Sequence, residues 1–144
     1  MFIGADIETK SLVEGHDAYA LQPWRVLTGE AIITDVSVAT IGGNSKTIPY
    51  SKVAMDELLL DLKSRGQTLV WWGGVFDLAF LWAAGHDLSG FNHIDGMHLV
   101  KWVKNSQRTE LGSYGWSLGE TAARWLKDLP WCDAFVAMKK RGHE

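Results

Sequence analysis

Residues 2–8, FIGADIE, constrain the fold more than any other stretch of the chain. Ile3, Ala5 and Ile7 recur at every second position, and this period of two places them on one face of a β-strand. Asp6 and Glu8 then lie together on the opposite face. The sequence therefore predicts a strand over residues 2–8 that carries an apolar face and a pair of carboxylates.

Two further strands are expected after an irregular excursion. Residues 11–30 contain two glycines and a proline and keep no sustained period, which is typical of loops. Residues 31–41 are rich in β-branched side chains, and the Gly-Gly-Asn sequence at 42–44 predicts a hairpin turn into a strand at 47–50. Three successive antiparallel strands predict a meander.

Helical patterns predominate from residue 51 onward. An apolar stripe predicts a helix over residues 51–65, with Gly66 as its stop, and residues 68–72 form a short apolar run typical of a buried strand. Residues 76–84 are apolar on every side except at Asp77, which predicts a fully buried helix.

Two more helices are expected nearer the C-terminus. One covers residues 96–105, and the other begins at the capping box of residues 117–120 and ends before Pro130. The order β, β, β, α, β, α predicts an α/β fold in which an antiparallel meander gains a parallel strand through a crossover helix. Helices are expected to cover this mixed sheet.

The composition agrees with one folded domain over residues 1–144. The chain is 47% hydrophobic and 22% charged, which excludes an intrinsically disordered chain. A single cysteine, Cys132, excludes a disulfide framework. The first residues lack a signal-peptide pattern, and the longest apolar stretch is interrupted by glycines and Asp77, so we expect no membrane partner and a cytoplasmic location.

The charge is unevenly distributed along the chain. Residues 1–96 hold 6 Lys and Arg against 12 Asp and Glu, whereas residues 97–144 hold 8 against 5. Proteins that bind polyanions can separate an acidic metal pocket from a basic face in this way. Charge alone does not decide between that interpretation and chance.

The first candidate site is the pair Asp6 and Glu8. Clustered carboxylates inside a sheet are costly unless cations neutralise them, which favours a metal site if this strand is central. On an edge strand, the same pair would be an ordinary solvated face.

Asp77 is the only Asp, Glu, Lys or Arg between Arg65 and Asp87. It either caps the first turn of its helix or serves as a third ligand beside Asp6 and Glu8. Three oxygen ligands without His or Cys favour Mg²⁺ or Mn²⁺.

These residues carry a resemblance to a known family. Asp6-Ile7-Glu8-Thr9, followed by residues 73–81 with the sequence GGVFDLAFL, resembles the first two motifs of the DEDD superfamily of 3′-to-5′ exonucleases, which has an RNase H-like fold. Ile94-Asp95 before a helix and the segment 112–118 resemble the proofreading exonuclease domain of bacteriophage family A DNA polymerases. The resemblance spans nearly the whole chain.

The resemblance implies a role for each matched residue. Asp6 would bridge two divalent cations, Mg²⁺ or Mn²⁺, while Glu8 binds one of them and Asp77 holds the other. The two ions would activate a water for in-line attack on the terminal phosphodiester. Thr9 would contact the terminal nucleotide through its backbone. Asp95 is a weaker candidate that would support the ligands, and its alternative role is the N-cap of the next helix.

The chain departs from the family at its last motif. The family places a fourth metal-binding Asp near its C-terminal end, four residues after a Tyr or His, and no such pair occurs here. The later aspartates, Asp128 and Asp133, lack that companion. We therefore expect a proofreading domain truncated at its C-terminal end, which a polymerase polypeptide or a second chain would complete.

The nucleic-acid contacts are expected from basic and aromatic residues. His98, Lys101 and Lys104, with Arg108 beyond them, recur at three- or four-residue steps and would form a basic stripe on one helix, either for phosphates or as a solvated face.

Aromatic residues around the glycine pair are the other expected contacts. Trp71, Trp72 and Phe76 flank the proposed metal site and would stack on an unpaired base. The pair Gly73-Gly74 allows either close approach to a nucleotide or a tight turn. Trp82 and Trp125 are expected in the core.

The sequence thus predicts a metal-dependent 3′-to-5′ exonuclease that acts on single-stranded DNA 3′ ends. One alternative is a catalytically silent module of the same fold that binds nucleic acid or completes a split polymerase or replication complex. Another is an RNA-directed member of the superfamily, because spacing does not reveal 2′-hydroxyl contacts. A phage-encoded chain would work in the cytoplasm of an infected bacterial host.

Overall fold

The computed structural model describes residues 1–104, 118 and 121–122. The chain divides into two compact units, Met1–Gly96 and Met97–Glu144. The first unit is described throughout and contains the whole sheet. The predicted helix from residue 117 to Pro130 and the predicted core residue Trp125 fall largely or entirely outside the described residues.

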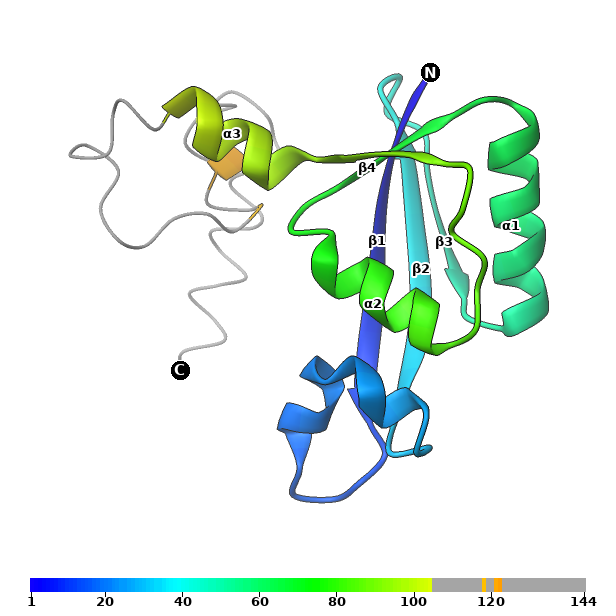
Figure 1. Ribbon diagram of the computed structural model, residues 1–144, viewed down its shortest axis with the longest axis vertical. Coiled ribbons are helices and arrows are strands. Elements are labelled where there is room, and N and C mark those ends of the chain that lie inside the picture. Colours follow the sequence, from blue (N-terminus) through cyan, green and yellow to red (C-terminus); the bar gives the residue numbers. More distant parts are fainter. Residues whose placement is uncertain (105–117, 119–120, 123–144) are drawn as a thin grey trace. The chain divides into compact units, whose positions relative to one another are not determined.

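The first unit is built on a five-stranded mixed sheet with the strand order β3-β2-β1-β4-β5 (Figure 1). β1 pairs antiparallel with β2, and β2 antiparallel with β3, while β1, β4 and β5 run parallel to one another. The strands are β1 (Phe2–Ser11), β2 (Ala31–Thr40), β3 (Ser45–Pro49), β4 (Thr68–Trp71) and β5 (Asn92–Asp95). The predicted meander and the predicted parallel strand are confirmed, whereas β5 was not predicted.

β1 is the central strand, and its two edges are paired to different extents. Its pairing with β2 runs from Ile3 to Ser11, with an irregularity between Glu8 and Thr9. Its pairing with β4 covers only Phe2 to Gly4, because β4 has four residues. The edge of β1 beyond Gly4 therefore lies open for contacts other than strand pairing.

The helix after β3 follows its sequence pattern closely. α1 (Lys52–Ser64) begins after Ser51, whose hydroxyl accepts a hydrogen bond of 3.1 Å from the Ala54 N–H. This cap satisfies one of the backbone donors that a helix start leaves free. The predicted apolar stripe is buried through Met55, Leu59 and Leu62.

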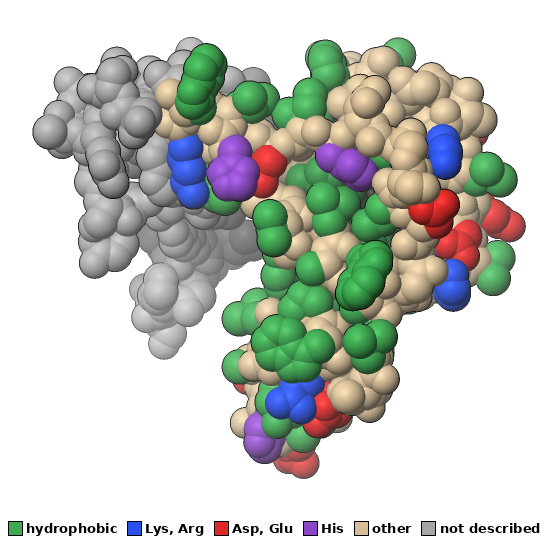
Figure 2. Space-filling view, in the orientation of Figure 1, with side chains coloured by type: hydrophobic (Ala, Val, Ile, Leu, Met, Phe, Trp, Pro, Cys, Tyr) green, Lys and Arg blue, Asp and Glu red, His purple; other side chains and the backbone are tan. Residues whose placement is uncertain are grey.

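α2 (Val75–Ala83) is buried on one face only. Asp77, Phe80 and Leu81 are buried, but Val75 and Trp82 are each 72% exposed. Figure 2 shows apolar side chains gathered over α2 and over the segment between β1 and β2. The predictions that this helix is buried on every side and that Trp82 belongs to the core are therefore wrong.

One apolar core joins the sheet to both helices. It covers the face of β1 that carries Ile3 and Ile7, and it receives Leu59 from α1 and Phe80 and Leu81 from α2. The remaining buried members are Ala31, Ile33, Val36, Met55, Leu62, Leu69 and Trp71. The face predicted to be apolar from the period of two is the face that packs.

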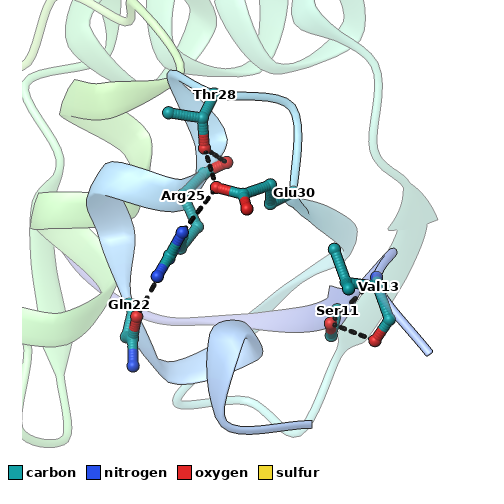
Figure 3. A network of polar contacts seen from close by, with 6 residues as sticks. All are labelled: Ser11, Val13, Gln22, Arg25, Thr28 and Glu30. Carbon is teal, nitrogen blue, oxygen red and sulfur yellow. Dashed lines mark hydrogen bonds and ion pairs between the residues drawn. The ribbon is translucent and has the colours of Figure 1, made fainter. Parts of the chain in front are cut away.

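The excursion between β1 and β2 contains two short 3₁₀ helices, η1 (Asp17–Leu21) and η2 (Pro23–Val26). The Arg25 guanidinium donates to Gln22 at 3.1 Å and to Glu30 at 2.7 Å. Figure 3 shows these contacts. Hydrogen bonds from Thr28 and Arg25 hold the pKa of the Glu30 carboxyl below its usual range. The Thr9 hydroxyl donates to the Ala20 carbonyl and so ties η1 to β1.

A buried histidine just after α2 links that segment to α1 and to the residue that follows β3. Nε2 of His86 shares a hydrogen bond of 2.8 Å with the Tyr50 hydroxyl. Its Nδ1 lies 2.7 Å from the Asp56 carboxylate of α1. Hydrogen bonds from Lys52 and His86 lower the pKa of the Asp56 carboxyl, while burial raises the pKa of Tyr50. The His86 side chain has no exposed surface.

α3 (Gly96–Lys104) follows β5 directly. The helix predicted over residues 96–105 is thus confirmed over Gly96–Lys104, and residue 105 lies outside the described residues. Among the residues described, no helix has the length and apolarity needed to cross a membrane.

Candidate functional site

The carboxylate pair lies on the central strand. Asp6 and Glu8 are exposed, and they alternate with the buried Ile3 and Ile7, as the period of two predicted. Partial burial of the Asp6 carboxyl nevertheless raises its pKa. β1 is central, but the pair is open to solvent rather than buried.

Asp77 reaches this strand from the first turn of α2. Its residue is 4% exposed, and its Oδ1 accepts a hydrogen bond of 3.1 Å from the backbone N–H of Ile7. Ile7 lies between Asp6 and Glu8 in the sequence, so the third carboxylate meets β1 at the predicted pair. The structure thereby brings Asp77 to the strand that carries Asp6 and Glu8.

The electrostatic environment of Asp77 opposes its negative charge. Burial is the main cause that raises the pKa of Asp77 to about 6, and the negative charges of Asp6 and Asp95 raise it further. The hydrogen bond from Ile7 acts in the opposite direction. Within the described part of the chain, neither Asp77 nor Asp6 forms an ion pair.

The short β4 strand explains why Asp77 can reach β1. β4 ends at Trp71, the chain turns at Gly73, and α2 begins at Val75. The Asp77 carboxylate then satisfies an N–H on the edge of β1 where pairing with β4 has ended. A buried backbone donor requires such a partner, so this aspartate also has a structural role.

Asp95 approaches the same turn from the end of β5. Its register partner in β4 is Trp71, and its two carboxylate oxygens accept hydrogen bonds from the N–H groups of Gly73 at 3.1 Å and Gly74 at 3.0 Å. It also directly precedes α3. These two bonds are a role that the sequence did not reveal, because they depend on the pairing of β5 with β4.

The glycine pair forms a tight turn. Gly73 has a φ of +74°, a left-handed conformation that glycine adopts without strain. A Cβ on Gly74 would lie 2.5 Å from the Cβ of Trp71, so no larger residue fits there without movement. Of the two interpretations of this pair, the tight turn is confirmed.

The aromatic residues near the turn differ in accessibility. Trp71 is 2% exposed and donates from its indole N–H to Nδ1 of His93 at 3.1 Å, so the prediction that it stacks on a base is wrong. Trp72 and Phe76 are half-buried, and Phe76 packs on Phe80 with ring centroids 4.7 Å apart. Base stacking by Trp72 and Phe76 stays a prediction.

The other predicted nucleic-acid contacts remain predictions. His98, Lys101 and Lys104 all lie within α3, spaced by three residues. They belong to the second unit, and Arg108 lies outside the described residues. The hydroxyl of Thr9 donates to the Ala20 carbonyl, and the predicted contact of its backbone with a nucleotide stays a prediction.

One further carboxylate was missed by the sequence analysis. Asp35 of β2 is the register partner of Glu8, and residues directly opposite in an antiparallel pair lie on the same face of the sheet. The two residues carry like charges. The signal that would have found Asp35 is the register of the first hairpin, which the sequence alone did not fix.

The donor set has the chemistry of a hard-cation site. The side chains of Asp6, Glu8 and Asp77 offer only carboxylate oxygens, which Mg²⁺ and Mn²⁺ prefer. Among the described residues, however, no three His, Cys, Asp or Glu side chains are gathered closely enough to hold an ion as they stand. Asp128 and Asp133, the later aspartates, lie outside the described residues.

Comparison with known proteins adds no family to this picture. The chain matches no protein-family model, and no curated protein is significantly similar to it.

Proposed function

We propose that this chain is a metal-dependent 3′-to-5′ exonuclease acting on single-stranded DNA ends, of the proofreading type found in bacteriophage family A DNA polymerases. The observation that carries the proposal is the meeting of Asp77 with the strand that bears Asp6 and Glu8. Two carboxylates of β1 and one of α2, which is far away in the sequence, meet at β1. The buried one, Asp77, has no ion-pair partner among the described residues.

The cost of this arrangement favours a bound cation. A carboxylate that is buried beside other negative charges is destabilising unless protonation or a cation neutralises it. Asp6, Glu8 and Asp77 would hold two divalent ions, Mg²⁺ or Mn²⁺. Such ions activate a water and stabilise the leaving oxygen of a phosphodiester.

The fold is compatible with the proposed family. An antiparallel meander joined by a parallel strand is the arrangement that the resemblance implies. Asp95 is the last residue of β5, and Asp6 lies just beyond the part of β1 that pairs in parallel with β4. Ligands of open α/β sheets bind outside the carboxyl ends of the strands. The finer assignment to an RNase H-like fold is part of this proposal.

In the first unit, Thr9, Trp72, Gly73 and Phe76 would contact the terminal nucleotide. In the second unit, His98, Lys101 and Lys104 would contact phosphates. A polymerase polypeptide or a second chain would supply the fourth carboxylate that the sequence lacks.

A second candidate function is a catalytically silent module of the same fold. It is favoured by the finding that three ligating side chains are not gathered within the described residues. Such a module would bind nucleic acid or complete a replication complex without cleaving DNA. The two candidates differ in their response to manganese.

The test is hydrolysis of a 5′-labelled single-stranded oligonucleotide with manganese. The exonuclease should shorten it stepwise from the 3′ end, and a 3′-terminal phosphorothioate linkage should slow the first step. Asp77→Asn and chelation of the metal should both abolish shortening. Asp87→Asn should retain it, because Asp87 is exposed and its carboxylate accepts from the nearby Ser89 N–H. A folded wild-type chain that leaves the oligonucleotide intact would favour the silent module.

A further inference from the structure

We infer that Asp95 is a positioning residue, which sets where Asp77 meets β1 by holding the Gly73-Gly74 turn. Its predicted consequence for metal binding rests on the proposed function. The predicted consequence for the position of Asp77 does not rest on the proposed function, because it follows from contacts between described residues.

The clamp itself consists of two hydrogen bonds on one carboxylate. Consecutive N–H groups, of Gly73 and Gly74, donate to separate oxygens of Asp95 at 3.1 and 3.0 Å. Hydrogen bonds to an ionised acceptor are about twice as strong as neutral ones. Two such bonds fix both the position and the orientation of the turn.

The strand register places this carboxylate beside the turn. Asp95 is the last residue of β5 and pairs with Trp71, the last residue of β4. The turn begins immediately after Trp71, so the side chain of Asp95 needs to span only the distance between neighbouring strands. Both hydrogen bonds to the turn therefore depend on the pairing of β5 with β4.

The position of the turn determines the position of Asp77, because close packing and a hydrogen bond hold the backbone between them. Gly74 packs so closely on Trp71 that even a methyl group would clash. In the first helical hydrogen bond of α2, the Leu78 N–H donates to the Gly74 carbonyl at 2.9 Å. Asp77 lies within the turn that this bond closes. A shift of Gly74 therefore moves the residue whose carboxylate accepts from Ile7.

The expected consequence concerns metal affinity rather than folding alone. Partners that orient a metal ligand typically change metal affinity or activity about 10- to 100-fold when they are removed. Asp95→Ala removes both acceptors. Asp95→Asn keeps one carbonyl oxygen as an acceptor and should have an intermediate effect.

The experiment uses the full chain without metal and then with manganese. Amide resonances of Gly73, Gly74 and Ile7 are compared in ¹⁵N-labelled wild type, Asp95→Ala, Asp95→Asn and the control Asp87→Ala. Free Mn²⁺ is then measured by electron paramagnetic resonance to give the Mn²⁺ dissociation constant of each variant. Asp87 is a matched control because its carboxylate also accepts from a backbone N–H, that of Ser89, away from the turn.

The inference is supported if all three resonances move in Asp95→Ala, move less in Asp95→Asn, and stay in place in Asp87→Ala, while Mn²⁺ binds about 10- to 100-fold more weakly to Asp95→Ala. It is overturned if the Gly73 and Gly74 resonances move but that of Ile7 does not, or if Asp95→Ala binds Mn²⁺ as tightly as a binding-competent wild type. If the wild type binds no Mn²⁺, the proposed function loses its metal site, and the Ile7 resonance alone decides the positioning role. Should Asp95→Ala not fold, Asp95→Asn provides the same comparison.

Discussion

The backbone N–H of Ile7 donates a hydrogen bond of 3.1 Å to Oδ1 of Asp77, across 70 positions of sequence. This bond completes the edge of β1 where β4 has ended, and it also brings a buried carboxylate next to Asp6. The same side chain thus stabilises the sheet through its oxygen and destabilises it through its charge. The effect of that charge on the free energy of unfolding can be measured.

The stability of the metal-free protein should depend on pH through Asp77. Its pKa rises from 3.8 to about 6 on folding, so the folded state binds the proton more tightly than the unfolded state. The stabilisation by that proton is complete below about pH 4 and is lost as the pH rises through about 6. A shift of about two pH units corresponds to about 3 kcal/mol.

Asp77→Asn isolates this effect, because the amide oxygen can still accept from Ile7 and cannot ionise. Urea unfolding at several pH values should show the variant to be more stable than the wild type above pH 6 and equal to it near pH 4. A constant difference across this range would contradict the assignment to Asp77.

Manganese should stabilise the wild type at pH 7.5 by binding where the carboxylates repel one another. A ligand at 100 times its dissociation constant adds about 2.7 kcal/mol to the free energy of unfolding. The rise in Tm should be smaller at pH 5, where Asp77 is mostly protonated, and absent in Asp6→Asn. Differential scanning fluorimetry with Asp87→Asn as the control measures this, and an equal rise in Asp6→Asn would place the ion elsewhere.

Gly74→Ala should destabilise the protein although Gly74 has an ordinary helical φ of −59°. The added Cβ would lie 2.5 Å from that of Trp71, and overpacking of this kind typically costs about 1–3 kcal/mol. Gly42→Ala is the matched control, since its nearest neighbour would be 3.9 Å away. Chemical denaturation of both variants tests the prediction, and equal midpoints would show that the turn can relax.

Tyr50→Phe should cost about 1–3 kcal/mol, because it leaves Nε2 of the buried His86 without its partner. Tyr19→Phe serves as a control: the Tyr19 ring lies under Arg25, a contact that phenylalanine keeps. Unfolding free energies of the two variants should differ by about that amount. Similar losses in both would mean that the loss reflects a general cost of removing a tyrosine hydroxyl.

The local patterns of the sequence were sufficient to predict most of the helices and strands. The period of two in β1, the Gly-Gly-Asn turn and the apolar stripe of α1 each describe packing within a single element, and all three predictions are confirmed. β5 was missed because Asn92–Asp95 is short and polar, and it is a strand only through its pairing with β4.

The errors at the site have a related cause. Trp71 and Trp82 have similar apolar neighbours in the sequence, yet one is buried and the other exposed, because burial depends on which side of the element the core covers. The convergence of Asp77 with β1 was one of two interpretations of its place in the sequence, and the family resemblance implied it as well. Its bond to Ile7 and the clamp by Asp95 depend on where β4 ends and how β5 pairs, which no local pattern records.

The enclosure of His86 has a consequence for spectroscopy. Asp56 and Tyr50 engage both ring nitrogens of His86, and the side chain has no exposed surface. The ring resonances of His86 should therefore report whether α1 and the end of α2 stay packed together in any variant of the carboxylates around β1.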